Sequence, residues 1–317
     1  MHGDTNIETH LKGEPMRIFR NRAIGAVLMA VALVATACSS GDDSQDGTTI
    51  VIGSANFGES ELVAEIYAQA LEAKGFTVER KFSVGSREIY AAALEAGELH
   101  LVPEYIGSAL TYLGGEASSD VVATTEALRT AWAPAGISVL EPAPAQDKNG
   151  FVVTKETADS LGAVNVSDLA AANGSLVLGG PPECPDRPFC LIGLEDTYGL
   201  TFASFRPLDA GGSLTVTALK EGEIDVGLLF TTDGVIAAEG FVLLADDMGL
   251  QPAESIVPAI ATSIVDEYGS DLEDVLNAVS AALTTEGLTE MNRLVGYVGD
   301  DPVQVATNWL QEVGLVG

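Results

Sequence analysis

Lysine and arginine are scarce in this chain: 15 basic residues stand against 46 acidic ones, giving a formal net charge of -31 at pH 7. Nucleic-acid phosphates and anionic lipid headgroups carry charge of the same sign, so they repel a chain with this excess. We therefore expect no nucleic acid among its partners. The 317 residues, 47% of them apolar, are enough for one large core or two medium ones, and the length favours two.

The N-terminus lacks an apolar run long enough to span a membrane. Residues 23–37 are apolar but number only 15, whereas a bilayer core needs about 20. Arg17, Arg20 and Arg22 precede the run, and small residues end it, as in secretory signals. We interpret residues 1–37 as a cleaved signal peptide. Met16 stands directly before the basic cluster and is an alternative translation start.

Cys38 follows this apolar run in the string Ala-Thr-Ala-Cys, which resembles a bacterial lipobox. In such a sequence the new N-terminal cysteine is diacylated, and two chains suffice for stable anchoring. Residues 38–48 are polar after the cysteine, as expected of a flexible spacer. The resemblance implies a lipid-anchored protein on the extracytoplasmic face of the cell membrane. The alternative is an ordinary signal peptide that releases a soluble product.

Histidine and cysteine are also few, three of each. Once residues 1–37 are removed, His100 is the single remaining histidine and lies in a predicted strand, which disfavours a Ser-His-Asp site. The sequence contains no nucleophile elbow, phosphate loop, dinucleotide fingerprint or zinc-binding helix motif. We therefore predict no metal, no cofactor and no enzymatic activity.

Cys184 and Cys190 remain after the lipidated cysteine and lie six positions apart. In an oxidising compartment, an even pair at this spacing is typical of a disulfide. Closing this loop would contribute about 2.4 kcal/mol in the chain-entropy model. The alternative, half of a metal site, lacks partner histidines.

The first half of the chain alternates strands with helices. We expect strands at 49–54, 76–82 and 99–102, and helices at 59–74, at 86–96 and from Ile106. Helices of this length between strands imply parallel βαβ units. Gly75 stands where the first helix should end.

The pattern restarts after a proline-rich break at residues 141–147. We expect strands at 151–154, 176–178 and 241–244, a helix capped by Ser167 that runs to Ala172, and a helix followed by a strand within 217–230; the tail should be helical at 272–283, 288–295 and 303–313. Two α/β units with a helical tail predict two lobes, whose cleft is the natural ligand site.

One internal repeat places an aromatic residue in each lobe. Residues 94–105 align without gaps with residues 219–230, and each copy has a glycine after a helix, a short strand and a final aromatic. Ligands of parallel sheets bind outside the carboxyl ends of the strands. Tyr105 and Phe230 should therefore face one cleft from opposite lobes. Alternatively, both are ordinary core aromatics.

Five strings, in this order, resemble the substrate-binding lipoproteins of glycine betaine, choline and carnitine ABC importers. They are IVIGSANFGESEL, GSREIYAAALEAGE, PEYIGSAL, DKNGFVVT and LLFTTDGVI, and the match extends over residues 49–309. The resemblance implies a bilobal α/β fold, the type II periplasmic-binding-protein architecture, with two lobes joined by a two-strand hinge. Lobe 1 would comprise 49–146 and 247–317, and lobe 2 would comprise 147–246.

A quaternary ammonium group has no N–H donor, so stacked aromatic faces are needed to capture it, at about 0.5–2 kcal/mol each. The anionic end of a betaine needs donors. The resemblance assigns both ends of the ligand to Tyr105 and Ser108, and the aromatic of the Thr-Thr-Asp motif to Phe230, followed by Thr231, Thr232 and Asp233.

Other positions of the family motif carry different residues. Asn149 stands where the family has an aromatic, so the cage lacks one wall. Asp147 matches a position that offers an oxygen to a cation, and Arg187 matches a carboxylate clamp. Asn56 and Phe57 end the first strand and should line the cleft floor, with Phe57 as a replacement wall.

The sequence thus predicts a monomeric receptor that presents a small-molecule ligand to an ABC permease and its ATPase. Two alternatives remain at this point. The same fold could hold a polar or polyhydroxylated solute through hydrogen bonds from Asn56, Ser108, Asn149, Thr231 and Asp233. It could also serve as a surface sensor or interaction protein without transport.

Overall fold

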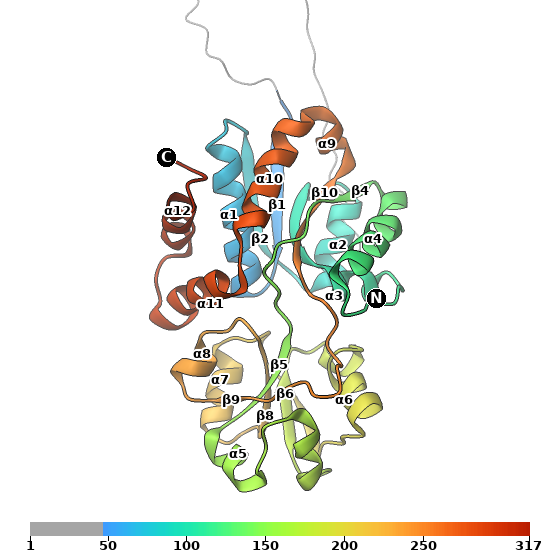
Figure 1. The fold of residues 1–317 in the computed structure, drawn as a ribbon, viewed down its shortest axis with the longest axis vertical. Coiled ribbons are helices and arrows are strands. Elements are labelled where there is room, and N and C mark those ends of the chain that lie inside the picture. Colours follow the sequence, from blue (N-terminus) through green and yellow to red (C-terminus); the bar gives the residue numbers. More distant parts are fainter. Residues whose placement is uncertain (1–46) are drawn as a thin grey trace, which may run out of the picture. The chain divides into compact units, whose positions relative to one another are not determined.

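The computed structural model describes residues 47–317, drawn in colour in Figure 1. The predicted signal peptide, Cys38 and the spacer up to residue 46 lie outside the described residues. Within residues 47–317, no helix combines the length and the apolar character needed to cross a membrane.

Lobe 1 is built on a five-stranded sheet with the order β2-β1-β3-β10-β4. Its strands are β1 (Ile50–Ala55), β2 (Val78–Gly85), β3 (Leu101–Tyr105), β4 (Ile137–Val139) and β10 (Ile256–Ala261). The first three strands pair in parallel, whereas β10 is antiparallel to both β3 and β4. The sheet is therefore mixed. Its antiparallel strand β10 follows the whole of lobe 2 in the chain.

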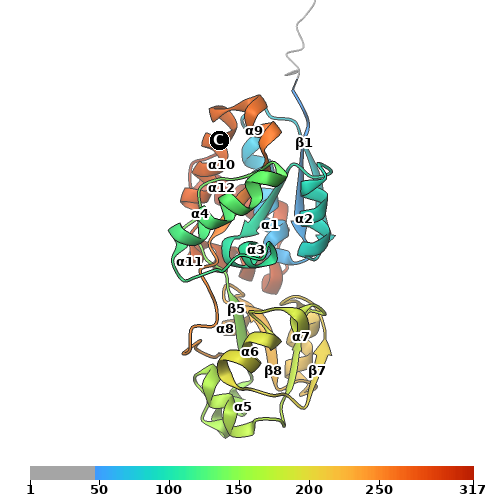
Figure 2. The same cartoon turned by 90° about the vertical axis from the view of Figure 1, so that its right-hand side faces the viewer.

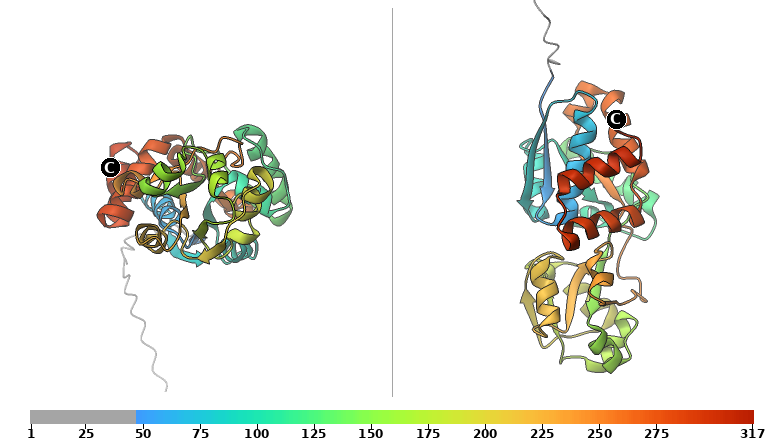
Figure 3. Two further views of the ribbon diagram at one scale, coloured as in Figure 1. Left: turned by 90° about the horizontal axis from the view of Figure 1, so that it is seen from below. Right: turned by 90° about the vertical axis from the view of Figure 1, so that its left-hand side faces the viewer.

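Helices cover both faces of this sheet, and two apolar clusters fill the interfaces. Figures 1 and 3 show α1 and α10–α12 on one side, and Figure 1 shows α2–α4 on the other. The helices are α1 (Gly58–Glu72), α2 (Arg87–Glu95), α3 (Ile106–Tyr112), α4 (Val121–Trp132), α9 (Thr262–Tyr268), α10 (Ser270–Ala282), α11 (Thr285–Arg293) and α12 (Pro302–Glu312), with a 3-10 turn η1 (Ala133–Ala135) and a π-helical turn η4 (Leu294–Val298).

Lobe 2 has the strand order β7-β6-β8-β5-β9. Its strands are β5 (Asn149–Val153), β6 (Val177–Gly180), β7 (Ser204–Pro207), β8 (Val226–Phe230) and β9 (Val242–Leu243). Its helical elements are α5 (Lys155–Leu161), η2 (Val166–Ala172), η3 (Cys184–Asp186), α6 (Leu191–Tyr198), α7 (Ser213–Lys220) and α8 (Val235–Ala238). Figure 2 shows α6 and α7 packed over the strands of this lobe.

Two segments join the lobes, one entering β5 and one leaving β9 (Figure 1). They pair with each other through an antiparallel bridge between Gln146 and Ser255, and the N–H of Asp147 donates to the carbonyl of Glu254. Asp246 still accepts hydrogen bonds from Tyr198, Leu250 and Gln251 beside lobe 2. Residues 248–251 of the returning segment therefore still lie against lobe 2, and the predicted lobe boundary at residue 247 stays a prediction.

The predicted parallel βαβ units are confirmed for β1, β2 and β3, although β10 and β5 add antiparallel strands to the two sheets. Two local expectations are wrong. The helix expected from Ser167 is a 3-10 helix that begins at Val166 after Asn165, whose N–H donates to Asp168; Ser167 lies inside it and donates to Asp247. Strand β10 was missed because Pro258 interrupts a short apolar run beside predicted helices.

We predict that Leu62→Ala lowers the free energy of unfolding by about 2–5 kcal/mol, because Leu62 is fully buried in α1 and its removal leaves a cavity. Both tryptophans, Trp132 and Trp309, lie in lobe 1, so tryptophan fluorescence during urea unfolding reports this change. Val122→Ala is the matched control, since Val122 is 72% exposed on α4. A loss as large in the control would contradict the assignment of the core.

Candidate functional site

A cavity of about 400 Å³ lies between the two lobes. Eight of the predicted site residues line it: Asn56, Phe57, Tyr105, Ser108, Asp147, Asn149, Arg187 and Phe230. They come from the turn between β1 and α1, from β3 and α3, from the connection before β5, from β5 itself, from the loop that follows β6, and from β8. The ends of strands from both sheets thus meet at one site.

Three rings form a continuous aromatic contact from one lobe to the other. The centroid of Phe57 lies 5.9 Å from that of Tyr105 and 5.0 Å from that of Phe230. Phe57 is the extended N-cap residue of α1, so its ring stands beside the first turn of that helix. Tyr105 and Phe230 come from opposite lobes as expected, and Phe57 links them.

Tyr90, Tyr112 and Phe189 also line the cavity and were not predicted. Tyr90 belongs to the string REIYAAAL of α2, and Tyr112 follows Ser108 by one helical turn on α3. The spacing of four residues was a signal for Tyr112. Phe189 stands next to Cys190 in a loop whose path the sequence pattern could not give.

Behind the rings lies a buried carboxyl group, that of Glu59 in the first turn of α1. It accepts hydrogen bonds from the hydroxyl of Tyr105 at 2.8 Å, the hydroxyl of Thr232 at 2.5 Å and the amide of Asn292 at 2.6 Å. Burial raises the pKa of this carboxyl above its ordinary value. Since Thr232 belongs to lobe 2 and the others to lobe 1, Glu59 joins the lobes.

The Thr-Thr-Asp motif serves this junction more than the cavity. Thr231 exchanges hydrogen bonds with Lys148 and donates to Asp147, and the N–H of Thr232 also donates to Asp147. Asp233 accepts from the N–H of Phe230 at 2.8 Å, and burial raises its pKa to about 7. None of Thr231, Thr232 and Asp233 lines the 400 Å³ cavity, although Asp233 borders a second hollow on the other side of Phe230.

Asp147 is buried where the first connection enters lobe 2. Its pKa is raised well above the ordinary value, first by burial and then by the nearby Glu59 and Asp233 carboxylates. A cation in the cavity would favour the charged form of this group. Asp147 thus lines the cavity, where the sequence predicts an oxygen for a positively charged ligand, and that role stays a prediction.

Glu254 holds Ser108 and the start of α3. Its carboxylate accepts from the N–H groups of Gly107 and Ser108, at 3.0 and 3.1 Å, and from the Ser108 hydroxyl at 2.6 Å. Burial raises the pKa of Glu254 to about 7, although the bonds from Ser108 oppose this shift. The proton of the Ser108 hydroxyl is thus directed to Glu254, which leaves its oxygen lone pairs for the cavity.

Two arginines line the cavity, and both are in ion pairs. Arg87 contacts the fully buried Glu104 at 3.0 Å, and Tyr90 donates to the same carboxylate at 2.8 Å. Arg187 contacts Glu88 of α2 at 2.7 Å, across from lobe 2 to lobe 1. The predicted clamp residue is therefore at the cavity, and it also bridges the lobes.

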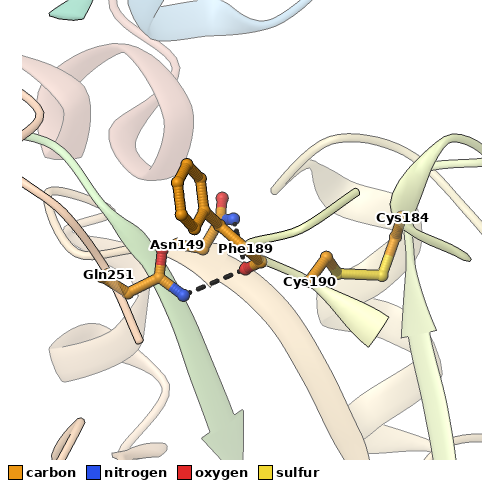
Figure 4. Close-up of a disulfide and its surroundings, with 5 residues drawn as sticks. All are labelled: Asn149, Cys184, Phe189, Cys190 and Gln251. Carbon is orange, nitrogen blue, oxygen red and sulfur yellow. Dashed lines mark hydrogen bonds between the residues drawn. A yellow bond between two sulfur atoms is a disulfide. The ribbon is translucent and has the colours of Figure 1, made fainter. Parts of the chain in front are cut away.

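Arg187 belongs to a loop closed by a disulfide between Cys184 and Cys190, whose Cα atoms are 5.3 Å apart. Figure 4 shows the loop beside β5. The amides of Asn149 and Gln251 both donate to the carbonyl of Phe189, at 2.9 and 3.0 Å. Asn149 also pairs with Phe230 in the β5–β8 ladder. Asn149 therefore connects the loop to the aromatic strand end.

The family model that describes the substrate-binding domain of ABC-type glycine betaine transport systems, OpuAC, matches residues 48–312. The chain belongs to this family. Among similar proteins, the glycine betaine-binding protein YehZ of Escherichia coli (strain K12) is 26% identical over 282 residues, covering 85% of this chain and 92% of YehZ. The glycine-betaine-binding protein of Pseudomonas aeruginosa is 28% identical over 276 residues, covering 83% and 88%.

Solved structures show the same fold. A crystal structure of a glycine betaine/carnitine/choline ABC transporter superposes with a TM-score of 0.68 at 24% identity, covering 84% of this chain and 99% of that one. Lactococcal OpuAC in its closed, glycine betaine-bound conformation gives 0.60 at 16% identity, covering 84% and 96%. The predicted family and the predicted bilobal fold class are confirmed. The OpuAC family consists of solute-binding domains and is not a family of enzymes.

We predict that Glu254→Gln stabilises the protein more at pH 8 than at pH 5. The carboxyl titrates near 4.5 when unfolded and at about 7 when folded, so its contribution to stability is fully present below pH 4.5 and lost as the pH rises through 7. A neutral glutamine does not lose this contribution, so the variant should gain on the order of 2 kcal/mol in free energy of unfolding at pH 8 relative to pH 5. Urea unfolding of both proteins at the two pH values measures this difference. Glu98→Gln, at an exposed position, is the control, and an equal pH effect in both variants would contradict the prediction.

Proposed function

We propose that this protein is the receptor of an ABC importer and binds a quaternary ammonium osmolyte, such as glycine betaine, choline or carnitine, in the cavity between its lobes. The observation that carries the proposal is the lining of that cavity. Six aromatic rings border it, from Phe57, Tyr90, Tyr105, Tyr112, Phe189 and Phe230. Aromatic faces attract a trimethylammonium group, which hydrogen bonds cannot capture.

The charges around the cavity support a cation. Asp147 and Glu254 line it and are buried, with pKa values raised by burial, so a bound cation would favour their ionised forms. A cation beside these carboxyls would offset part of the cost of burying their charge. The trimethylammonium end of the ligand belongs on this side of the cavity.

The carboxylate of a betaine or carnitine needs donors, and Arg187 is the best placed residue. One of its terminal nitrogens contacts Glu88, but a guanidinium has five N–H donors and can serve two anions. Asn56 lines the same cavity and is exposed, so its amide is accessible. Choline, which lacks the carboxylate, would need neither residue.

The remaining parts of the proposal concern transport and location. The lobes, 49–146 with 247–317 and 147–246, would close over the ligand by hinge motion at the paired connections, and the closed monomer would dock on the permease that its ATPase drives. A diacylated Cys38 would hold the receptor at the extracytoplasmic face of the membrane.

Calorimetric titration with glycine betaine, choline, carnitine and proline betaine tests the ligand class. We expect saturable binding of at least one of the four. Phe230→Leu should weaken that binding about tenfold, because it removes a ring that faces the cavity and contacts Phe57.

The control is Phe202→Leu, which alters a half-buried ring that packs against the core of lobe 2 and does not line the cavity. Circular dichroism and melting temperature show that each variant folds. If none of the four ligands binds the wild-type protein, the ligand class is wrong and the family assignment stands.

For the anchor, we predict that Cys38→Ser moves the protein from the membrane fraction to the soluble extracytoplasmic fraction or leaves it as an unprocessed precursor, because serine cannot be diacylated. Fractionation and mass spectrometry of the N-terminal peptide measure this. Cys184→Ser does not touch the lipobox and should stay with the membrane. A wild-type protein that lacks acyl chains would contradict the anchor.

A further inference from the structure

Phe189 differs from the other aromatic residues of the cavity in what it packs against. In the part of the chain that the structure describes, the other five rings each belong to an apolar core cluster or pack against one. Phe189 packs against none of the four clusters, although its side chain is half-buried and lines the cavity. Its ring therefore contributes little to the packing of lobe 2. The ring lines the cavity, where a bound ligand could contact it.

The backbone at Phe189 is fixed on both sides. Its carbonyl accepts one hydrogen bond from Asn149 on β5 and one from Gln251 on the returning connection (Figure 4). The next residue, Cys190, is buried and joined to Cys184. In Figure 4 the ring projects from the loop on the side opposite the sheet of lobe 2. A ring on a fixed backbone has two side-chain torsions left, so ordering it on binding costs little entropy.

Asn149 is the residue of β5 that lines the cavity, and it contributes an amide, so β5 itself presents no ring to the cavity. The amide is used instead to hold the loop that carries Phe189. Because Asn149 pairs with Phe230 across the ladder, the loop is anchored directly beside a ring of the aromatic contact described above.

We propose that Phe189 is a ligand-contacting wall of the aromatic cage, and that Asn149, Gln251 and the Cys184–Cys190 disulfide are positioning groups for it. The proposal rests on the proposed function, because it assumes a quaternary ammonium ligand. It assigns to the disulfide loop a role in recognition.

The test compares a cation with its uncharged carbon analogue, glycine betaine with 3,3-dimethylbutanoate, by calorimetry on the mature protein. The two ligands share shape and carboxylate, so their affinity ratio reports what the positive charge contributes to binding, and the change of this ratio in a ring variant reports the share of that ring. Phe189→Leu should weaken betaine binding about tenfold and reduce this ratio, whereas Phe189→Tyr should retain both. Phe205→Leu, at a half-buried ring that packs against the core of lobe 2 and does not line the cavity, is the matched control and should leave the ratio unchanged.

Asn149→Leu separates positioning from direct contact. If Asn149 acts through Phe189, then Asn149→Leu alone weakens betaine binding, but adds little in a protein that already carries Phe189→Leu. The double variant Cys184→Ser with Cys190→Ser should likewise weaken betaine binding in the wild-type background and add little in the Phe189→Leu background. Melting curves establish that each variant is folded.

Three outcomes overturn the proposal. If folded Phe189→Leu binds betaine with the wild-type affinity, then Phe189 is not a wall of the cage, and the proposed function is unaffected. Fully additive effects of Asn149→Leu and Phe189→Leu remove the positioning role. A wild-type protein that binds none of the four osmolytes sinks the proposed function, and this inference with it.

Discussion

The buried carboxyl group of Glu59 is the interaction on which the rest of the site depends. A carboxyl without partners in this position would cost several kcal/mol, and Glu59 has donors from Tyr105, Thr232 and Asn292. Tyr105 and Asn292 belong to lobe 1, and Thr232 belongs to lobe 2. Because Glu59 lies in the first turn of α1, the same bonds fix the ring of Phe57 at the start of that helix and the ring of Tyr105 beside it.

This arrangement explains which ligand chemistry suits the cavity. Most polar side chains on its surface already have protein partners: Arg87 has Glu104, Ser108 has Glu254, Arg187 has Glu88, and Asn149 has the carbonyl of Phe189. Apart from the spare N–H donors of Arg187 and the exposed amide of Asn56, the ring faces are the part of the lining that a ligand can still contact. A ligand rich in hydroxyl groups would have to compete for occupied donors and acceptors, whereas a quaternary ammonium group needs only aromatic faces and nearby negative charge.

Most of the element order in each lobe, and the aromatic residues at the strand ends of the cavity, were predictable from local patterns. Tyr105, Phe230, Asn56 and Phe57 stand at strand ends, and in an α/β fold such positions meet at one edge. Phe189, by contrast, depends on a loop path set by two distant amides and a disulfide, and no periodicity encodes such contacts. The same holds for Glu59 and Glu254, two of many acidic residues, whose burial follows from tertiary packing alone.

The position of β10 imposes an order on the making of the protein. This strand lies between β3 and β4 in the sheet of lobe 1, yet its residues follow the whole of lobe 2 in the chain. A chain synthesised and exported from its N-terminus can complete lobe 2 while the inner edges of β3 and β4 are still unpaired. Until residues 256–261 are available, the unpaired edges of β3 and β4 can form hydrogen bonds with other chains. Residues 256–261 thus complete the sheet of lobe 1, and truncation before β10 would leave β3 and β4 without the strand that joins them.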